Sequence, residues 1–216
     1  DMLRRNMVDG VIVNSLNIGA EAYAEMGLSL VGIDCDLGEA SVQIASDSYS
    51  IGELATRRLI DDGCSRILCL RSNSRMRMPA NKRTDAYLDV VEQAGLPALV
   101  REVEFVKPDD EKSAVVAKIL DENPDIDGIF AGDDTMAAIC LNVMKQRGLS
   151  APGDIKVVGA DGARRTMTFM PDLTTVRQDI DRIGELAAQS IIALINGEKP
   201  ESNIKLPVEL IEGKTA

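Results

Sequence analysis

The chain has 216 residues, a formal net charge of −11 and 45% apolar residues. This length and apolar content predict one large α/β domain or two small lobes, and they exclude a disordered chain. The acidic balance excludes a surface that holds DNA by itself, because duplex binding requires a basic footprint.

No apolar run reaches membrane-spanning length, and the first ten residues lack the apolar core of a signal peptide. We therefore expect a cytoplasmic protein with no membrane partner. The first residue is not Met, so we expect that an upstream segment precedes it. The four cysteines form no CxxC pair and the chain has no histidine. Free thiols are expected, with no metal and no cofactor.

Strand-like runs alternate with helical patterns, which is typical of βαβ units on parallel sheets. The first part of the chain predicts strands over 10–13, 30–33 and 41–46, with a helix near 19–26. Ser46 or Asp47 then caps a helix that Gly63 ends. Next come strands over 66–70, 102–106 and 128–131, and helices over 82–94, from Pro108, and from Asp133 or Asp134 to Gly148.

Residues 155–178 are the stretch around which the rest is organised. The apolar pair Val157-Val158 leads into a polar corner that ends at Asp161, and a second strand is predicted over 173–176. A helix over 179–196 and a strand over 204–211 follow. An acid at the carboxyl end of a parallel strand marks the place where open α/β sheets bind ligands.

Polar residues recur at such strand ends or at the following helix start. They are Asp47, Arg83, the pair Asp133-Asp134, and Asp161. Helix capping alone would explain each acid taken singly. Taken together, they are better explained by a shared crevice, in which carboxylates opposite an arginine would orient a polyol.

Arg83 is more informative than a typical surface arginine. At 100° per residue it shares a helix face with Tyr87 and Val90, the face that must pack. A cation in the first turn also opposes the helix dipole. We therefore expect Arg83 to have an acidic neighbour or a ligand.

Catalytic motifs are absent from the sequence. The chain has no histidine for general base work, no GxSxG elbow, no Walker A loop and no GxGxxG after a strand. Paired carboxylates are compatible with glycoside chemistry, but nothing in the sequence fixes their separation. We therefore predict that the protein is not an enzyme.

Several motifs resemble the effector-binding core of the lac repressor/galactose repressor (LacI/GalR) family. They include VDGVIV at 8–13, LATRRLIDDG at 54–63, FAGDDTMA at 130–137, VVGADG at 157–162 and PDLTTVRQD at 171–179. The resemblance covers nearly the whole chain in the right order.

This resemblance implies a periplasmic-binding-protein-like fold of type I, with two Rossmann-like lobes that have parallel sheets and close on a small effector. The start of the first lobe and the DNA-binding headpiece would be missing. Residues 1–59 and 179–197 would form the N-terminal lobe, and residues 60–174 and 203–214 the C-terminal lobe. Residues 175–178 would form a hinge crossing that includes Thr175, Val176 and Gln178.

The resemblance also implies which residues contact the effector. Arg83, Asp133 and Asp161 match family contact positions, although Asp133 stands where relatives have an amide. Asp134 matches the acid that follows that amide, and Asp47 matches another acid that lines the cleft. Aromatic residues make up only 3% of the chain, so the candidates for stacking on a sugar are Phe105, Phe169 and Tyr49.

The resulting hypothesis is the ligand-sensing core of a transcriptional regulator, most simply a repressor. It would bind a sugar or sugar derivative, form a homodimer, and reach operator DNA only through the missing headpiece. The alternative is a solute-binding protein of a sugar transporter. Basic residues at 75, 77, 82, 83, 164 and 165 keep an anionic sugar open, although they could also simply balance 35 acids.

Overall fold

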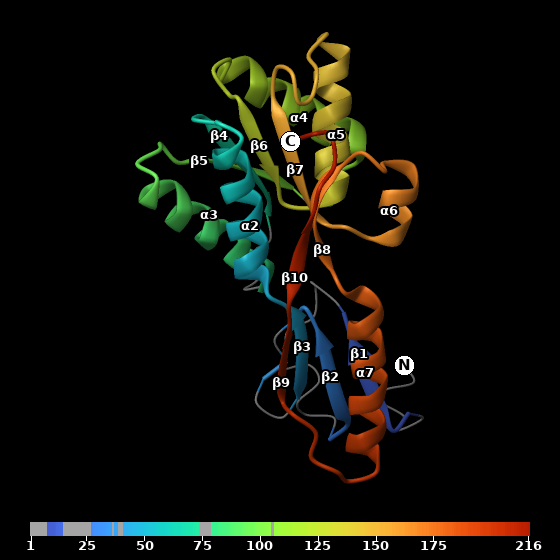
Figure 1. Cartoon of the computed structure of the whole chain (residues 1–216). Coiled ribbons are helices and arrows are strands. Elements are labelled where there is room, and N and C mark those ends of the chain that lie inside the picture. The colour runs from blue at the N-terminus through green and yellow to red at the C-terminus, as the bar shows by residue number, and fades with distance from the viewer. Residues whose placement is uncertain (1–7, 15–26, 36, 39–40, 74–78, 105) are drawn as a thin grey trace. The chain divides into compact units, whose positions relative to one another are not determined.

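The structure, a computed structural model, describes residues 8–14, 27–35, 37–38, 41–73, 79–104 and 106–216. Its internal contacts divide the chain into two compact units. Unit 1 comprises residues 1–47, 76–80 and 179–207, and unit 2 comprises residues 48–75, 81–178 and 208–216. Each unit contains one sheet, and the chain passes between the units several times, as Figure 1 shows by its colour order.

Unit 2 is built on a six-stranded sheet with the order β10-β8-β7-β6-β4-β5. All neighbouring strands run parallel except β10, which pairs antiparallel with β8. The strands are β4 (Ile67–Asn73), β5 (Leu99–Glu104), β6 (Gly128–Ala131), β7 (Lys156–Asp161), β8 (Thr174–Gln178) and β10 (Val208–Ile211). From β4 the chain passes to β5 on one side, and after β5 it crosses to β6 on the other side of β4. This reversal creates a topological switch point beside β4.

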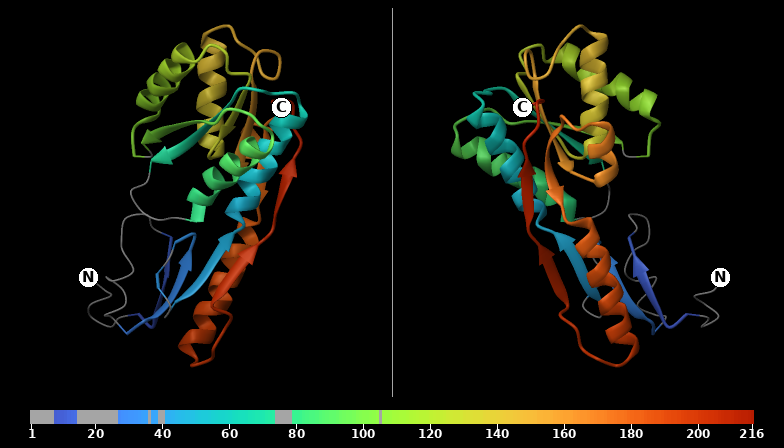
Figure 2. Two further views of the ribbon diagram at one scale, coloured as in Figure 1. Left: turned by 90° about the vertical axis from the view of Figure 1, so that its left-hand side faces the viewer. Right: turned by 45° about the vertical axis from the view of Figure 1, so that its right-hand side comes forward.

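Helices cover both faces of this sheet, because the strand side chains alternate between two apolar clusters. Helices α2 (Ser48–Asp61) and α3 (Lys82–Gln93) pack on the face that includes Ile67 and Cys69. Helices α4 (Asp109–Glu122) and α5 (Asp134–Gln146) pack on the face that includes Leu68 and Leu70. Figure 2 shows the two helix pairs on opposite sides of the sheet.

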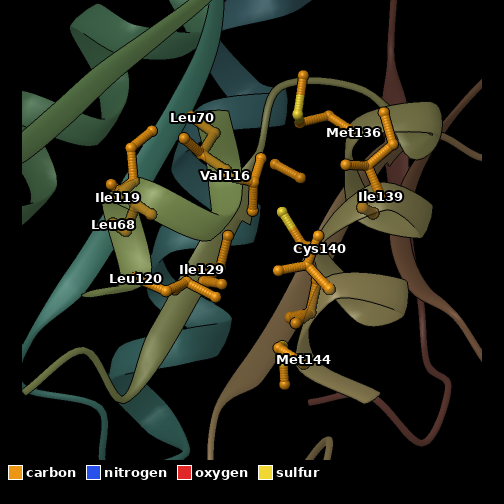
Figure 3. Packing of buried hydrophobic residues seen from close by; sticks show 14 of the residues in the cluster. Leu68, Leu70, Val116, Ile119, Leu120, Ile129, Met136, Ile139, Cys140 and Met144 are labelled. Carbon is orange, nitrogen blue, oxygen red and sulfur yellow. The ribbon is translucent and has the colours of Figure 1, made fainter. Parts of the chain in front are cut away.

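The second of these clusters is the larger core. Side chains from α4, such as Val116 and Ile119, meet Leu68 and Leu70 of β4, while those of α5 close the other side (Figure 3). Cys140 lies within it and is fully buried. Burial raises the pKa of the Cys140 thiol to about 12, so this cysteine is a small core residue and not a nucleophile.

Unit 1 contains a parallel sheet with the order β1-β2-β3-β9 in its described part. The strands are β1 (Gly10–Val13), β2 (Ser29–Ile33), β3 (Val42–Ser46) and β9 (Asn203–Leu206). Helix α7 (Ile180–Ile195) packs on this sheet through Ile183 and Ala187, which contact Val31 and Ile44. The described residues also include a 3-10 turn at Pro79–Asn81 and the short helix α6 at Arg164–Phe169.

This division differs from the predicted lobes at helix α2 and at the last predicted strand; it also places residues 76–80 in unit 1 and the predicted hinge crossing, residues 175–178, in unit 2. Helix α2 was expected in the first lobe, but its buried face packs on the core of unit 2 through Ile51, Ala55 and Leu59. The predicted strand over 204–211 is broken at Pro207 into β9 in unit 1 and β10 in unit 2. Proline interrupts a strand because it has no N–H to donate.

In the part of the chain that the structure describes, no helix is both long and apolar enough to span a membrane.

Candidate functional site

Arg83 stands at the start of α3 and links two strand ends of unit 2. Its Nη2 donates to Asp161 Oδ1 over 3.2 Å, and its Nη1 donates to the carbonyl oxygen of Gly132, just after β6. Its side chain is only 12% exposed. The predicted acidic neighbour is therefore confirmed, and it explains how a cation is tolerated on the packed face of a first helical turn.

The position of Arg83 is set by close contact between α2 and α3. A Cβ added at Gly52 of α2 would lie 2.1 Å from the carbonyl oxygen of Arg83. Only glycine allows this approach of two helix backbones. On the other side, Tyr87 anchors α3 to the sheet, donating from its hydroxyl to the Ile67 carbonyl over 2.7 Å and accepting from Leu99 N over 2.8 Å.

Asp161 ends β7 and faces Arg83. Its Oδ1 also accepts a 2.6 Å hydrogen bond from Gln178 Nε2, at the end of β8. Its backbone φ is +117°, an unusual value for a residue other than glycine, and such strain is concentrated at functional sites. Burial raises the pKa of Asp161 to about 6; the charge of Arg83 opposes this shift, and those of Asp133 and Asp134 add to it.

Asp133 caps helix α5, as predicted. Its Oδ1 accepts from the backbone N–H of Met136 over 2.7 Å. The residue is partly exposed, and no described residue donates to its second carboxylate oxygen, Oδ2. Capping uses only half of the carboxylate, so the capping and ligand-binding interpretations are compatible for Asp133.

Asp134, which was also predicted to contact the effector, has both carboxylate oxygens engaged within the protein. It is 3% exposed, its Oδ1 accepts from Thr175 Oγ1 over 2.6 Å, and its Oδ2 accepts from Gly162 N over 2.8 Å. Burial raises the pKa of its carboxyl, while these hydrogen bonds lower it. Asp134 is therefore a positioning residue that ties α5 to β8 and to the turn after β7. Glycine at 159 makes the room, since a Cβ there would lie 2.6 Å from Asp134 Oδ1.

Asp47 belongs to unit 1, where its Oδ2 pairs with Lys205 Nζ over 3.1 Å, and Phe105 lies outside the described residues. Tyr49 donates to Asp89 over 2.8 Å, and Phe169 is 76% exposed on α6. The cluster that the structure assembles in unit 2 is thus Arg83, Asp133, Asp134 and Asp161.

The predicted hinge residues lie inside the sheet of unit 2. Thr175 and Val176 are fully buried in β8, and Val176 belongs to the core that α2 and α3 cover. Gln178 is the last residue before the chain enters unit 1. Its bond to Asp161 was missed by sequence reasoning, which treated Gln178 only as part of a crossing. The sequence did offer an indication of this bond, because Asp161 and Gln178 are the last residues of two consecutive strands, β7 and β8.

The arrangement can hold a ligand that carries hydroxyl groups. Asp133 and Asp161 present carboxylate oxygens, and Arg83 presents N–H groups, at the carboxyl ends of β6 and β7. Carboxylate acceptors beside a guanidinium orient hydroxyl groups. Within the described residues, no group of His, Cys, Asp and Glu side chains is arranged to hold a metal ion.

Comparison with known proteins shows which family the chain belongs to. The profile of the periplasmic binding protein-like domain matches residues 56–216. The sucrose operon repressor of Pediococcus pentosaceus is 33% identical over 217 residues, which cover 100% of this chain and 66% of that protein. The ribose operon repressor of Halalkalibacterium halodurans is 30% identical over 215 residues, covering 99% of this chain and 64% of that protein.

A solved complex of the transcriptional regulator CelR with cellobiose has the same fold. It superposes with a TM-score of 0.87 at 27% identity, covering 99% of this chain and 68% of that chain. The present chain therefore spans about two thirds of the length of these regulators and somewhat less of the ribose operon repressor.

Proposed function

We propose that this chain, which belongs to the periplasmic binding protein-like domain family and matches LacI-type regulators along its whole length, is the effector-binding core of a transcriptional repressor. A small sugar-like effector would bind at the strand ends of unit 2. Its binding would control the affinity of a helix–turn–helix headpiece for operator DNA in the full-length protein. The protein would act in the cytoplasm as a homodimer and would catalyse no reaction.

The observation that carries this proposal is the similarity to operon repressors over essentially the entire chain. The alternative, a solute-binding protein of a sugar transporter, has no comparable support, because these relatives are repressors. Relatives named for sucrose and ribose operons, and a regulator solved with cellobiose, support a sugar or sugar derivative as the effector class.

In this proposal the effector contacts Arg83, Asp133 and Asp161 directly. Arg83 would donate to ring or hydroxyl oxygens, and the two carboxylates would accept from hydroxyl groups. Asp134 would act indirectly, by holding the turn after β7 through Gly162. Asp47 and Phe105 stay predicted contacts.

The connection between the site and the change of state would pass through Gln178. Its side chain donates to Asp161, and the next residue, Asp179, caps α7 of unit 1 through Arg182 N over 3.0 Å. An effector that binds Oδ2 of Asp161 would shift this carboxylate and so reorient Gln178, which bonds to its Oδ1, at the chain crossing. Such a ligand shifts the population of two arrangements by as much as its affinity differs between them.

The experiment that tests this function measures operator binding by the full-length protein with and without sugars. Ligands are first identified by thermal shift, and operator affinity is then followed by gel shift. The proposal expects at least one bound sugar to change operator affinity about fivefold or more, the lower range of allosteric coupling. Unchanged operator affinity with every sugar that binds would contradict it.

A further inference from the structure

The cluster in unit 2 carries more negative than positive charge. The cluster holds three carboxylates, from Asp133, Asp134 and Asp161, and one guanidinium, that of Arg83, which pairs with Asp161. The charges of Asp133 and Asp134 both disfavour ionisation of Asp161, so the three acids are close enough to repel one another. A ligand that enters here meets a surplus of negative charge.

The one cation of the cluster is already engaged. Arg83 donates to Asp161 and to the Gly132 carbonyl, and its Nε is buried with no partner among the described residues. An anionic ligand group would have to compete with Asp161 for this guanidinium. It would then leave the Asp161 carboxylate near Asp133 without its cationic partner, which is costly in a partly buried site.

Acceptor atoms, in contrast, are free. Asp133 uses Oδ1 for the helix cap, and Asp161 uses Oδ1 for both Arg83 and Gln178. In each residue Oδ2 has no donor among the described residues. These two carboxylate oxygens favour a ligand edge that donates hydrogen bonds, and they favour it more if that edge is positively charged.

Nearby basic residues do not reverse this balance. Arg71, within β4, forms an ion pair with Glu102, and Arg177, beside Gln178, forms one with Glu209. Lys82, Arg164 and Arg165 are exposed, where the interaction of a cation with an ion is weak, and positions 75 and 77 lie outside the described residues. The anionic sugar that the sequence left open therefore finds little support in the part of unit 2 that the structure describes.

We propose that Asp133 sets the charge specificity of this site, selecting an amine-bearing polyhydroxy compound over its neutral parent and excluding the phosphorylated or carboxylated counterpart. This inference rests on the proposed function, since it specifies the ligand of the same site. The ammonium group of the ligand donates to Asp133 Oδ2, and its hydroxyl groups occupy Asp161 Oδ2 and the remaining N–H groups of Arg83.

The test compares matched sugars on the full-length protein by isothermal titration calorimetry. The probes are glucose, glucosamine, glucose 6-phosphate and glucuronate, and the corresponding galactose series, with sucrose, cellobiose and ribose as further neutral sugars. We expect the amine to bind about tenfold more tightly than its neutral parent, as a charge-assisted hydrogen bond allows. The phosphate and the uronate should bind more weakly than the parent.

Asp133→Asn is the decisive variant, because asparagine also caps helices well and the fold should be retained. It should abolish the amine preference, so that the amine no longer binds more tightly than its neutral parent, because the variant lacks the negative charge that the ammonium group pairs with. The control is Asp110→Asn, which removes the same charge from the exposed first turn of α4 and should leave the preference intact.

Two results would overturn the inference without touching the proposed function. One is a phosphorylated or carboxylated sugar that binds more tightly than its parent. The other is an amine preference that is absent from the wild-type protein or survives in Asp133→Asn. If none of the sugars binds at all, both the inference and the proposed effector class fail.

Discussion

Thr175 Oγ1 donates a 2.6 Å hydrogen bond to Asp134 Oδ1, joining the middle of β8 to the first turn of α5. Both residues are buried, at 0% and 3% exposure. Through its other oxygen, Asp134 holds the backbone at Gly162, next to Asp161. One buried carboxylate thus fixes the relative positions of the strand ends that carry the candidate site.

Replacing Thr175 by valine should test this arrangement. The shape is conserved, but a buried carboxylate oxygen loses its donor, so the free energy of unfolding should fall by about 1–3 kcal/mol. Thr56→Val is the matched control, since the buried Thr56 hydroxyl donates only to the Gly52 carbonyl within its own helix. That change should cost less than about 1 kcal/mol. Urea unfolding measures the change in the free energy of unfolding for both variants. Equal decreases would show that the hydrogen bond to Asp134 contributes no more than a hydrogen bond within a helix.

Gly52→Ala should destabilise the protein although alanine favours helices. The new Cβ would lie 2.1 Å from the Arg83 carbonyl oxygen, so α2 and α3 must separate, at a cost of about 1–3 kcal/mol. In Gly184→Ala, on α7, the new Cβ meets nothing within 4 Å. This control should gain up to about 1 kcal/mol from helix propensity. Thermal unfolding of both variants measures these changes in stability. A Gly52→Ala variant more stable than the wild type would contradict the close contact between α2 and α3.

Asp161 should make stability depend on pH in a defined window. Burial raises its folded-state pKa from 3.8 to about 6, so between these values the folded protein binds the proton more tightly than the unfolded chain does. The contribution of Asp161 to stability is therefore complete below pH 3.8 and is lost as the pH rises towards 6. Relative to wild type, Asp161→Asn should gain stability across this window, as followed by urea unfolding at several pH values.

Asp154→Asn provides a control of opposite sign. Hydrogen bonds from the Ser150 hydroxyl and backbone lower the pKa of Asp154. Its contribution is present above the unfolded pKa and is lost as the pH falls through the folded value. Relative to wild type, this variant should therefore lose stability as the pH rises out of the acid range. The same slope in both variants would contradict the assignment for Asp161.

Local features of the fold could be predicted from the sequence because local physics decides them. The strand at 128–131, the cap at Asp133 and the buried face that carries Arg83 and Tyr87 all follow from apolar runs, capping chemistry and helix periodicity. The sequence also indicated that Arg83 needs an acidic neighbour or a ligand. It did not identify Asp161 as that acid, which depends on the order of the strands.

The parts that were missed depend on packing between distant segments. The predicted strand over 102–106 lies at Leu99–Glu104, because its register follows β4. The role of Asp134 depends on Thr175, 41 positions away, and on space left by a glycine in a neighbouring strand. Helix α2 carries an apolar stripe that suits either unit, and only the observed core assigns it to unit 2.

The central claim, that Arg83 belongs to the effector site, is tested most directly by the thermal shift produced by the tightest-binding sugar in Arg83→Ala. Arg147→Ala is the matched control, because Arg147 likewise donates to one carboxylate, Asp121, and one backbone carbonyl, Ala117. A ligand at a hundred times its dissociation constant stabilises a protein by about 2.7 kcal/mol. We predict that this stabilisation is lost in Arg83→Ala and retained in Arg147→Ala, whereas an undiminished shift in folded Arg83→Ala would contradict the account.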